Sequence, residues 1–403
     1  MRIVHTSDWH LGKNLENIPR LDEQEKFCDD FIKLVEEKKA DIVVIAGDIY
    51  DTYNPSAAAE SLFYRTIEKL SDGGKRYVYI IAGNHDNPDR LEAINPIVEG
   101  KGISILGFPK SIAKTGKFEG FEIIDSKEGF TKVKIGEETI NIIGIPYPSE
   151  KRLNEIIEGY EDEGDMQKSY SQKIGDTFRE LEKNYKDNEI NIAVSHIFVV
   201  GSSVSDSERR IELGGSLLVE KKDLPEKSQY TALGHIHKPQ RMSKKLNAYY
   251  SGSPIQYSKN ERSSSKSVYI VDLKAGEEAK IYQEFIRNYR PIELFRCEGI
   301  EEALKVANEN AENDIFSYFE IKTDKSLEAE DIRNIKKIMK NVLEIRPIIE
   351  GSDEFVKKEV VDINRNNIED FFRDFFKENK GTDPSEEVMS IFRELVSENE
   401  EVE

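Results

Sequence analysis

Short apolar runs alternate with amphipathic stretches through the first half of the chain. Residues 41–46 and 77–82 are near-continuous apolar runs rich in β-branched side chains, which is typical of strands buried on both faces of a sheet. Residues 2–6 form a similar apolar-rich strand at the start of the chain. Residues 23–38 and 57–70 repeat apolar positions with the period of a helix. This alternation predicts an α/β domain that binds ligands at the carboxyl ends of its strands.

More strands follow, and the pattern then changes to a smaller unit. Further strands are predicted at 139–145, 190–195, 229–233, 248–251, 267–273 and 279–286, with a charged, helical insertion between 149 and 189. Residues 291–349 then read as a β-α-β-α-β unit. We therefore divide the chain into a large domain at 1–287, a small α/β domain at 288–352, a linker at 353–366 and a helix-loop-helix at 367–403.

The C-terminal segment predicts two short amphipathic helices. Their apolar stripe follows the spacing i, i+3, i+4, i+7 and includes Phe371, Phe372, Phe375, Phe376, Ile391, Phe392 and Leu395. Patterning alone leaves two interpretations open. The helices either fold back on the core of the chain or form a docking arm whose apolar face is covered by a partner.

Composition narrows the class of protein. A chain of 403 residues with 37% hydrophobic residues can form two or three domains, and it has no uncharged apolar run of about 18 residues that could span a membrane. Cys28 and Cys297 are isolated, and the chain starts with a strand, so we expect reduced thiols, no signal peptide and a cytoplasmic protein. The net charge of −20 argues against a surface that attracts DNA everywhere, although a local basic patch or a partner can still capture it.

Polar motifs follow the apolar runs and contain five of the six histidines. Their candidate metal ligands are Asp8, His10, Asp48, Asn84, His196, His235 and His237. This set is too large for one ion and fits two neighbouring ions. Mixed oxygen and nitrogen ligands without thiolate favour manganese, iron, zinc or magnesium and do not choose among them. A pair of such ions could hold and activate a phosphodiester.

Neighbours of the ligands have their own expected roles. His85 follows Asn84 and is the natural non-ligand, able to protonate a leaving oxygen, with Asp86 fixing its tautomer. Asp51 lies three residues past Asp48 and is expected to support a ligand from behind. His5, inside the first strand, is expected to do the same. Each motif alone is also compatible with a turn or a structural histidine, but all five in order, each at a strand end, favour the metal centre.

Five sequence blocks carry a family resemblance. They are Met1–Gly12, Ala46–Asp51, Gly83–Asp86, Gly234–Pro239 and Tyr250–Ser258. The blocks resemble the signature of the calcineurin-like metallophosphoesterases and, among these, the SbcD family of nuclease subunits of bacterial SbcCD complexes, which are related to the archaeal and eukaryotic double-strand-break repair nuclease. The resemblance implies an α/β fold: a metallophosphoesterase β-sandwich flanked by helices, a small α/β capping domain at 288–352 and a C-terminal helical arm.

The resemblance also implies a site and partners. Asp8, His10, Asp48 and His237 would hold the first ion, and Asp48, Asn84, His196 and His235 the second, with manganese preferred and His85 acting on the phosphate. Archaeal relatives place a histidine where this chain has Asp51, which leaves the role of Asp51 open. The implied activity is ATP-dependent double-strand exonuclease and hairpin endonuclease cleavage in DNA repair, replication and recombination. The implied assembly is a homodimer, joined by helices near 57–70 and 90–98, whose C-terminal arm binds the coiled-coil base of an SbcC-type ATPase.

Basic residues near the motifs are candidate DNA contacts, and an ordinary solvated surface is the alternative. They are Lys13, Arg20, Arg209, Arg210, Lys238, Lys259 and Arg262, with Arg209 and Arg210 in a serine-containing loop at 201–215. Two other functions are compatible with the motifs: a phosphodiesterase or phosphatase acting on a small molecule, and a structural scaffold for an ATPase. The small domain and the Phe-rich arm disfavour the first, and the complete set of ligands disfavours the second.

Overall fold

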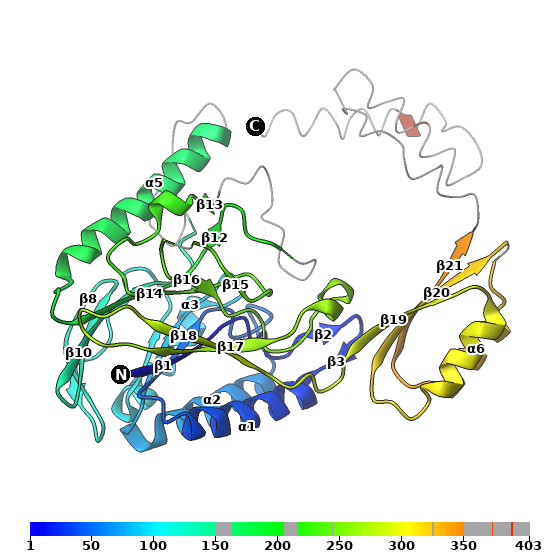
Figure 1. Ribbon diagram of the computed structural model, residues 1–403, viewed down its shortest axis with the longest axis horizontal. Coiled ribbons are helices and arrows are strands. Elements are labelled where there is room, and N and C mark those ends of the chain that lie inside the picture. Colours follow the sequence, from blue (N-terminus) through cyan, green and yellow to red (C-terminus); the bar gives the residue numbers. More distant parts are fainter. Residues whose placement is uncertain are drawn as a thin grey trace. The chain divides into compact units, whose positions relative to one another are not determined.

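A computed structural model describes residues 1–149, 163–204, 217–243, 245–324, 326–349, 373 and 388–389. Two large sheets form its centre (Figure 1). The six-stranded sheet has the order β18 (Lys280–Phe285), β17 (Ser267–Asp272), β1 (Arg2–Thr6), β4 (Ile42–Ala46), β5 (Tyr77–Ile81) and β6 (Ile103–Leu106). The eight-stranded sheet has the order β15 (Gln240–Arg241), β16 (Ala248–Tyr250), β14 (Tyr230–Gly234), β11 (Ile190–His196), β10 (Glu138–Ile145), β9 (Phe130–Ile135), β8 (Glu122–Lys127) and β7 (Gly116–Lys117).

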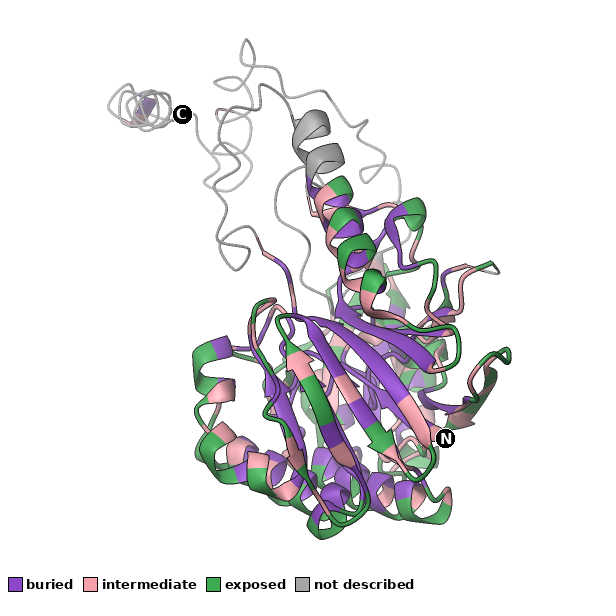
Figure 2. Cartoon of the chain, turned by 90° about the vertical axis from the view of Figure 1, so that its left-hand side faces the viewer, coloured by how far each residue is buried: buried purple, intermediate pink, exposed green. Residues whose placement is uncertain are grey.

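The two sheets pack face to face, and helices cover their outer faces. Because side chains alternate along a strand, Ile42 and Val44 of β4 enter the layer between the sheets, whereas Val43 and Ile45 face α1 (Leu21–Glu37) and α2 (Ala57–Ser71). On the other outer face, side chains of α5 (Glu163–Leu181) pack against β10 and β11. Figure 2 shows central strands that are almost wholly buried, while the helices expose their outer faces. These observations confirm the expected sandwich.

Two groups of parallel strands position the metal motifs. β1, β4 and β5 are parallel neighbours in one sheet, and β11 and β14 are parallel neighbours in the other. Contacts of β4 with β11 and β14 place the two groups opposite each other. The carboxyl ends of five strands therefore meet at one edge of the sandwich, as the apolar runs predict.

A third, three-stranded sheet follows the sandwich in sequence. It has the order β19 (Ile292–Cys297), β20 (Phe316–Thr323) and β21 (Val342–Ile349), with helices α6 (Ile300–Glu309) and α7 (Ala329–Ile338). These elements have the predicted order β-α-β-α-β, while the domain bounds at 288–352 stay a prediction. The Arg20 guanidinium lies 4.6 Å from the centre of the Phe316 ring, and that of Arg290 lies 5.1 Å from it, so this sheet packs against the large domain.

Contacts divide the chain into two units. The first comprises Met1–Ile321 and Glu328–Arg346, and the second comprises Lys322–Leu327 and Pro347–Glu403. The linker and the two C-terminal helices expected at 353–403 lie outside the described residues, apart from Arg373, Val388 and Met389. Their interpretation stays a prediction.

Several described elements are not anticipated by the apolar pattern. β6 to β9 are among them, and the β8–β9 hairpin lies toward one end of its sheet, where Glu122, Asp125 and Lys127 interrupt the apolar run. The remaining short elements are α3 (Pro88–Glu92), α4 (Asn95–Val98), β2 (Asn14–Leu15), β3 (Ile18–Pro19), β12 (Phe198–Val199), β13 (Leu218–Val219), and 3-10 turns η1 (Asp72–Gly74), η2 (Glu99–Lys101), η3 (Glu182–Asn184), η4 (Lys221–Asp223) and η5 (Lys259–Ser263).

Two further findings bear on the class of protein. Cys28 and Cys297 are both buried and free, in agreement with a packing role. Among the helices that the structure describes, none combines the length and the apolar character required to cross a bilayer.

Candidate metal centre

Sharp backbone turns aim the first three ligand candidates at one point. Asp8, His10 and Asp48 have φ angles of 55°, 44° and 52°, a region that non-glycine residues enter at a cost of about 1–3 kcal/mol each. The amide of Asp8 donates to the Gly47 carbonyl at 3.0 Å, and that of His10 donates to the Asp48 carbonyl at 3.0 Å. The β1 and β4 loops thus hold each other in the strained conformation. Such strain concentrates at functional sites.

Asp8, His10 and His237 bring their ligand atoms together on one side of the centre. Their ligand atoms lie within 4.8 Å of one another, and all three residues are buried. The Nε2 atoms of His10 and His237 are 2.9 Å apart. Two ligands at right angles on one ion, each with a bond of about 2.1 Å, would lie about 3 Å apart. The spacing therefore fits two imidazoles on a common ion.

Asn84, His196 and His235 meet on the other side. Asn84 Oδ1 is 3.0 Å from His196 Nε2 and 2.9 Å from His235 Nδ1. His196 Nδ1 lies 2.8 Å from the Ala46 carbonyl oxygen. A carbonyl oxygen can only accept a hydrogen bond, so Nδ1 carries the ring proton. The lone pair of Nε2 then faces Asn84. These atoms also have the spacing of neighbouring ligands on one ion.

Asp48 lies between the two groups. Its Oδ2 atom is 3.5 Å from His10 Nε2 and 3.5 Å from His196 Nε2. Although burial raises the pKa of Asp48, the nearby rings of His196, His85 and His10 bring that pKa below its usual range. Asp48 is therefore an ionised carboxylate that can bridge two cations.

Burial also prepares the imidazoles. It lowers the pKa of His235 to about 3 and that of His10 well below its ordinary value. Both rings are therefore neutral near pH 7 and carry the lone pair that a metal ligand needs. The spacing of the donors, the ionised Asp48 and the neutral His10 and His235 fit two divalent cations.

Two glycines let the ligand loops approach closely. A Cβ at Gly83 would overlap the Asp48 side chain and main chain. A Cβ at Gly234 would overlap the Ala46 carbonyl and lie 2.8 Å from His196 Nδ1. Glycine at these two positions therefore allows the ligand loops to pack closely enough to form the site.

Gly234→Ala is expected to disturb the centre. Overpacking costs about 1–3 kcal/mol, so the free energy of unfolding should fall by that amount. The affinity for Mn²⁺ should fall with it because His196 must shift. Urea denaturation and calorimetric Mn²⁺ titration measure both effects. Gly100→Ala, which adds a methyl group where nothing lies within 4 Å, is the matched control. An equal free energy of unfolding and an equal Mn²⁺ affinity in the two variants would contradict the expected clash at Gly234.

His85 lies at the centre, but its partner differs from the expected one. Its Nδ1 atom is 2.7 Å from the main-chain oxygen of Asp51. Asp86 instead accepts hydrogen bonds from the amides of Ile49, Tyr50 and Gly83 at 3.1, 2.9 and 2.8 Å. The carbonyl of Asp51 therefore fixes the His85 tautomer, and Asp86 anchors the loop that carries Asp48.

Asp51 and His5 occupy different surroundings. The Asp51 carboxylate pairs with Lys13 Nζ at 2.7 Å and lies 3.6 Å from His10 Nδ1, beyond hydrogen-bond distance, so its support of His10 stays a prediction. His5 lies in the inter-sheet layer, where Nδ1 is 2.8 Å from the Tyr230 hydroxyl and the ring stacks on Tyr269. Within the described part of the chain, its ring contacts are tyrosines and not candidate ligands.

The predicted DNA-contact residues separate into groups. Lys238 is exposed directly after His237, and Lys13 is half-buried beside Asp51. Arg20 is fully buried, paired with Glu23 and stacked on Phe316, so it offers no charge at the surface. Lys259 pairs with Glu320 across to the small domain, and Arg262 is exposed. Arg209 and Arg210 lie outside the described residues.

Glu261 and Lys266 form a charged pair behind His237 that the sequence did not predict. Glu261 Oε1 lies 3.5 Å from His237 Nδ1, and Lys266 contacts Glu261 from the loop that precedes β17. Both side chains are buried. Their spacing from the histidine motif carries no recognisable pattern, so only the folded chain brings them together.

Comparison with known proteins identifies the family of this chain. A family model described as calcineurin-like phosphoesterase matches residues 1–239. The chain therefore belongs to the calcineurin-like phosphoesterase family. The SbcD subunit of nuclease SbcCD from Bacillus subtilis is 38% identical over 404 residues, which cover 100% of this chain and 99% of that protein. Within the larger family, the chain accordingly belongs to the SbcD family of nuclease subunits.

Two further matches are more distant. The SbcD subunit of nuclease SbcCD from Staphylococcus epidermidis is 29% identical over 387 residues, covering 94% of this chain and 93% of that protein. The crystal structure of a dimetal phosphatase from Danio rerio aligns with 70% of this chain and 99% of its own length, with 11% identity and a TM-score of 0.36. The structural likeness is too low to carry an argument.

Proposed function

We propose that this chain is the nuclease subunit of an SbcCD-type complex and hydrolyses DNA phosphodiester bonds with two divalent metal ions. The convergence of carboxylate, imidazole and amide donors from five strand ends carries this proposal. Full-length similarity to the SbcD subunit of nuclease SbcCD supports the same class of substrate.

The donor set supports a division of ligands around Asp48. Asp8, His10 and His237 would hold one ion, and Asn84, His196 and His235 the other. Such a pair of ions supplies, when bound, a nucleophile at neutral pH and neutralises charge on the phosphate. The first group includes a carboxylate of its own, whereas the second has a neutral amide.

We propose Mn²⁺ as the physiological metal, since oxygen and imidazole ligands suit it.

His85 is proposed to act on the phosphate. Its Nδ1 bond to the Asp51 carbonyl fixes the ring and leaves Nε2 for the substrate. In the imidazolium form, Nε2–H can donate to a phosphate oxygen or to the leaving oxygen. The ring packs edge-on to His10 with centroids 4.6 Å apart, which keeps it beside the first group of ligands.

DNA must approach an acidic protein with a net charge of −20. Lys238, exposed beside His237, supplies positive charge at the centre, whereas Lys13 is paired with the Asp51 carboxylate. So few contacts hold a duplex weakly, because affinity grows with each neutralised phosphate. We therefore propose that an SbcC-type ATPase supplies much of the DNA clamp and makes double-strand exonuclease and hairpin endonuclease cleavage depend on ATP.

The assembly is proposed from the family. Two copies of this chain would form a homodimer through α2 and the α3–α4 region, and each would bind one ATPase through the C-terminal arm. We also propose a cytoplasmic, nucleoid-associated location; the two free, buried cysteines fit a reducing compartment.

The arm gives a direct prediction for the partner. Phe371→Asp with Phe375→Asp should weaken binding of the ATPase by about 10³-fold, since interface anchors are worth about 2 kcal/mol or more each. Co-purification measures the loss, and Mn²⁺ content should stay unchanged. Undiminished co-purification would mean that these phenylalanines fill a core within the chain.

One assay distinguishes the proposed function from its alternatives. The purified chain, with and without an SbcC-type ATPase, is given Mn²⁺, hairpin DNA and a chromogenic phosphodiester. We expect cleavage of the hairpin, increased by the ATPase and ATP. Cleavage of the chromogenic ester alone would indicate a small-molecule enzyme, and silence on both would indicate a scaffold.

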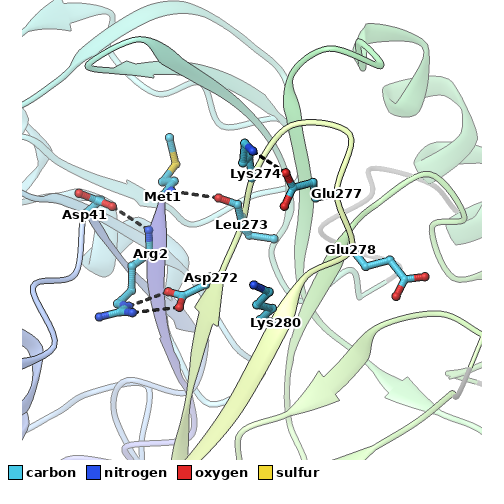
Figure 3. A pocket seen from close by; sticks show the side chains of 9 residues that line it. All are labelled: Met1, Arg2, Asp41, Asp272, Leu273, Lys274, Glu277, Glu278 and Lys280. Carbon is cyan, nitrogen blue, oxygen red and sulfur yellow. Dashed lines mark hydrogen bonds and ion pairs between the residues drawn. The ribbon is translucent and has the colours of Figure 1, made fainter.

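A described pocket does not favour the small-molecule alternative. It lies at the amino end of β1 and at the β17–β18 turn (Figure 3). The metal ligands instead follow the carboxyl end of β1. Arg2 pairs with Asp272 at 2.6 Å, and the Met1 ammonium donates to the Leu273 carbonyl at 2.9 Å. Arg2, Asp272 and the Met1 ammonium in this pocket are thus already held by contacts within the protein.

A further inference from the structure

A buried charge pair stands behind His237 and has no part in the proposed cleavage. Glu261, in η5, places Oε1 3.5 Å from His237 Nδ1. Lys266 contacts the other oxygen of Glu261. Both side chains are only 2% exposed. Burying two charges is costly unless their geometry and hydrogen bonds compensate, so a pair at this position calls for an explanation.

Lys266 fixes the pair to the backbone that carries His237. Its ammonium donates to the His237 carbonyl at 3.1 Å and to Ser253 Oγ at 2.8 Å. Gly252, with a φ of 79°, allows this loop to approach, because a Cβ there would lie 2.7 Å from the His237 carbonyl. All three donors of the ammonium are thus used.

Glu261 sets the tautomer of His237. An imidazole whose Nδ1–H donates to a carboxylate presents the Nε2 lone pair and becomes a more basic ligand. In this chain, Nε2 of His237 is the atom that lies 2.9 Å from His10 Nε2, on the side of the first group of ligands. The carboxylate and the ion would therefore lie on opposite sides of the same ring.

In the second group of ligands, the hydrogen-bond partner behind the histidine ring is a neutral group. His196 Nδ1 faces the neutral carbonyl of Ala46 at 2.8 Å. A neutral carbonyl polarises an imidazole less than a carboxylate does. The two ion positions are consequently built to differ.

We infer that Glu261 is a positioning residue for His237, with Lys266 as its buried counter-ion, and that it strengthens binding of the ion held by His10 and His237 over that of its neighbour. This inference rests on the proposed function only for the presence of two ions.

Mn²⁺ binding to the full chain tests the inference without reference to cleavage. Isothermal titration and the electron paramagnetic resonance of free Mn²⁺ resolve the two affinities. Glu261→Gln should weaken one ion by about 10–100-fold, the usual effect of losing a partner behind a metal ligand, and leave the other unchanged. Glu320→Gln removes the carboxylate of a more exposed Glu–Lys pair, with Lys259, which contacts no candidate ligand, and serves as the control. Equal affinities in Glu261→Gln and the unaltered chain would overturn the inference.

A double variant separates positioning from folding. Glu261→Gln leaves Lys266 buried without its counter-ion, and Glu261→Gln with Lys266→Met removes both charges, so the melting temperature should recover in the double variant. Under our inference, the weakened Mn²⁺ affinity does not recover with it. Recovery of both together would show that the pair has only a structural role. If the unaltered chain bound no Mn²⁺, the proposed function itself would fail, whereas failure of the inference alone leaves the nuclease proposal intact.

Discussion

Asp48→Asn should lower DNA cleavage by about 10³-fold or more while the chain stays folded. Its carboxylate lies 3.5 Å from a histidine of each ligand group and is the charged oxygen donor that both would share. The amide of Asn keeps the shape but removes the bridging charge. Losing about 4 kcal/mol of transition-state stabilisation corresponds to about 10³ in rate.

The Asp48 experiment needs a metal count beside the rate. Mn²⁺ content, measured by atomic emission, should fall from two ions to one or none in Asp48→Asn. Asp125→Asn, an exposed carboxylate on β8, is the matched control and should keep both ions and the full rate. Normal cleavage with two ions bound to Asp48→Asn would remove Asp48 from the centre.

His85→Gln should retain both ions and lose about 10²–10⁴-fold in turnover, the usual contribution of a general acid, which is the role proposed for His85. The structure supports this expectation because His85 packs against His10, while its Nδ1 is occupied by the Asp51 carbonyl. Single-turnover cleavage of hairpin DNA at saturating Mn²⁺ measures the chemical step.

The control for His85 is another buried histidine. His5→Gln changes a ring that contacts Tyr230 and Tyr269, and its turnover should stay within a few-fold of the unaltered chain. Loss of an ion from His85→Gln would reassign His85 as a ligand. A turnover equal to that of His5→Gln would deny it any role in the chemistry.

Much of the fold could be predicted because its central strands are buried on both faces. A continuous apolar run such as 42–46 indicates a strand that is covered on both faces. The polar residues that follow such parallel strands must lie at one edge of the sheet. The β8–β9 hairpin escaped prediction because an edge of the sheet tolerates charged and apolar side chains in mixed order. Its burial is set by the neighbouring strands and not by its own pattern.

Side-chain roles at the centre were only partly predictable. Asp86 follows His85 directly, but the turn directs its carboxylate to the amides of Ile49 and Tyr50. Arg20 lies near a motif in sequence, yet Phe316, almost 300 positions later, covers its guanidinium. The contact of Glu261 with His237 was not predicted either, because it joins two separate segments of the chain. Contacts between distant segments decide these cases, and no local pattern contains them.

Anomalous scattering from a crystal soaked in Mn²⁺ would show directly whether two ions bind at this edge of the sandwich. We expect two peaks about 3.5–4 Å apart, one beside His10 and His237, the other beside Asn84 and His196, with Asp48 touching both. A single peak, or peaks remote from these side chains, would contradict this expectation.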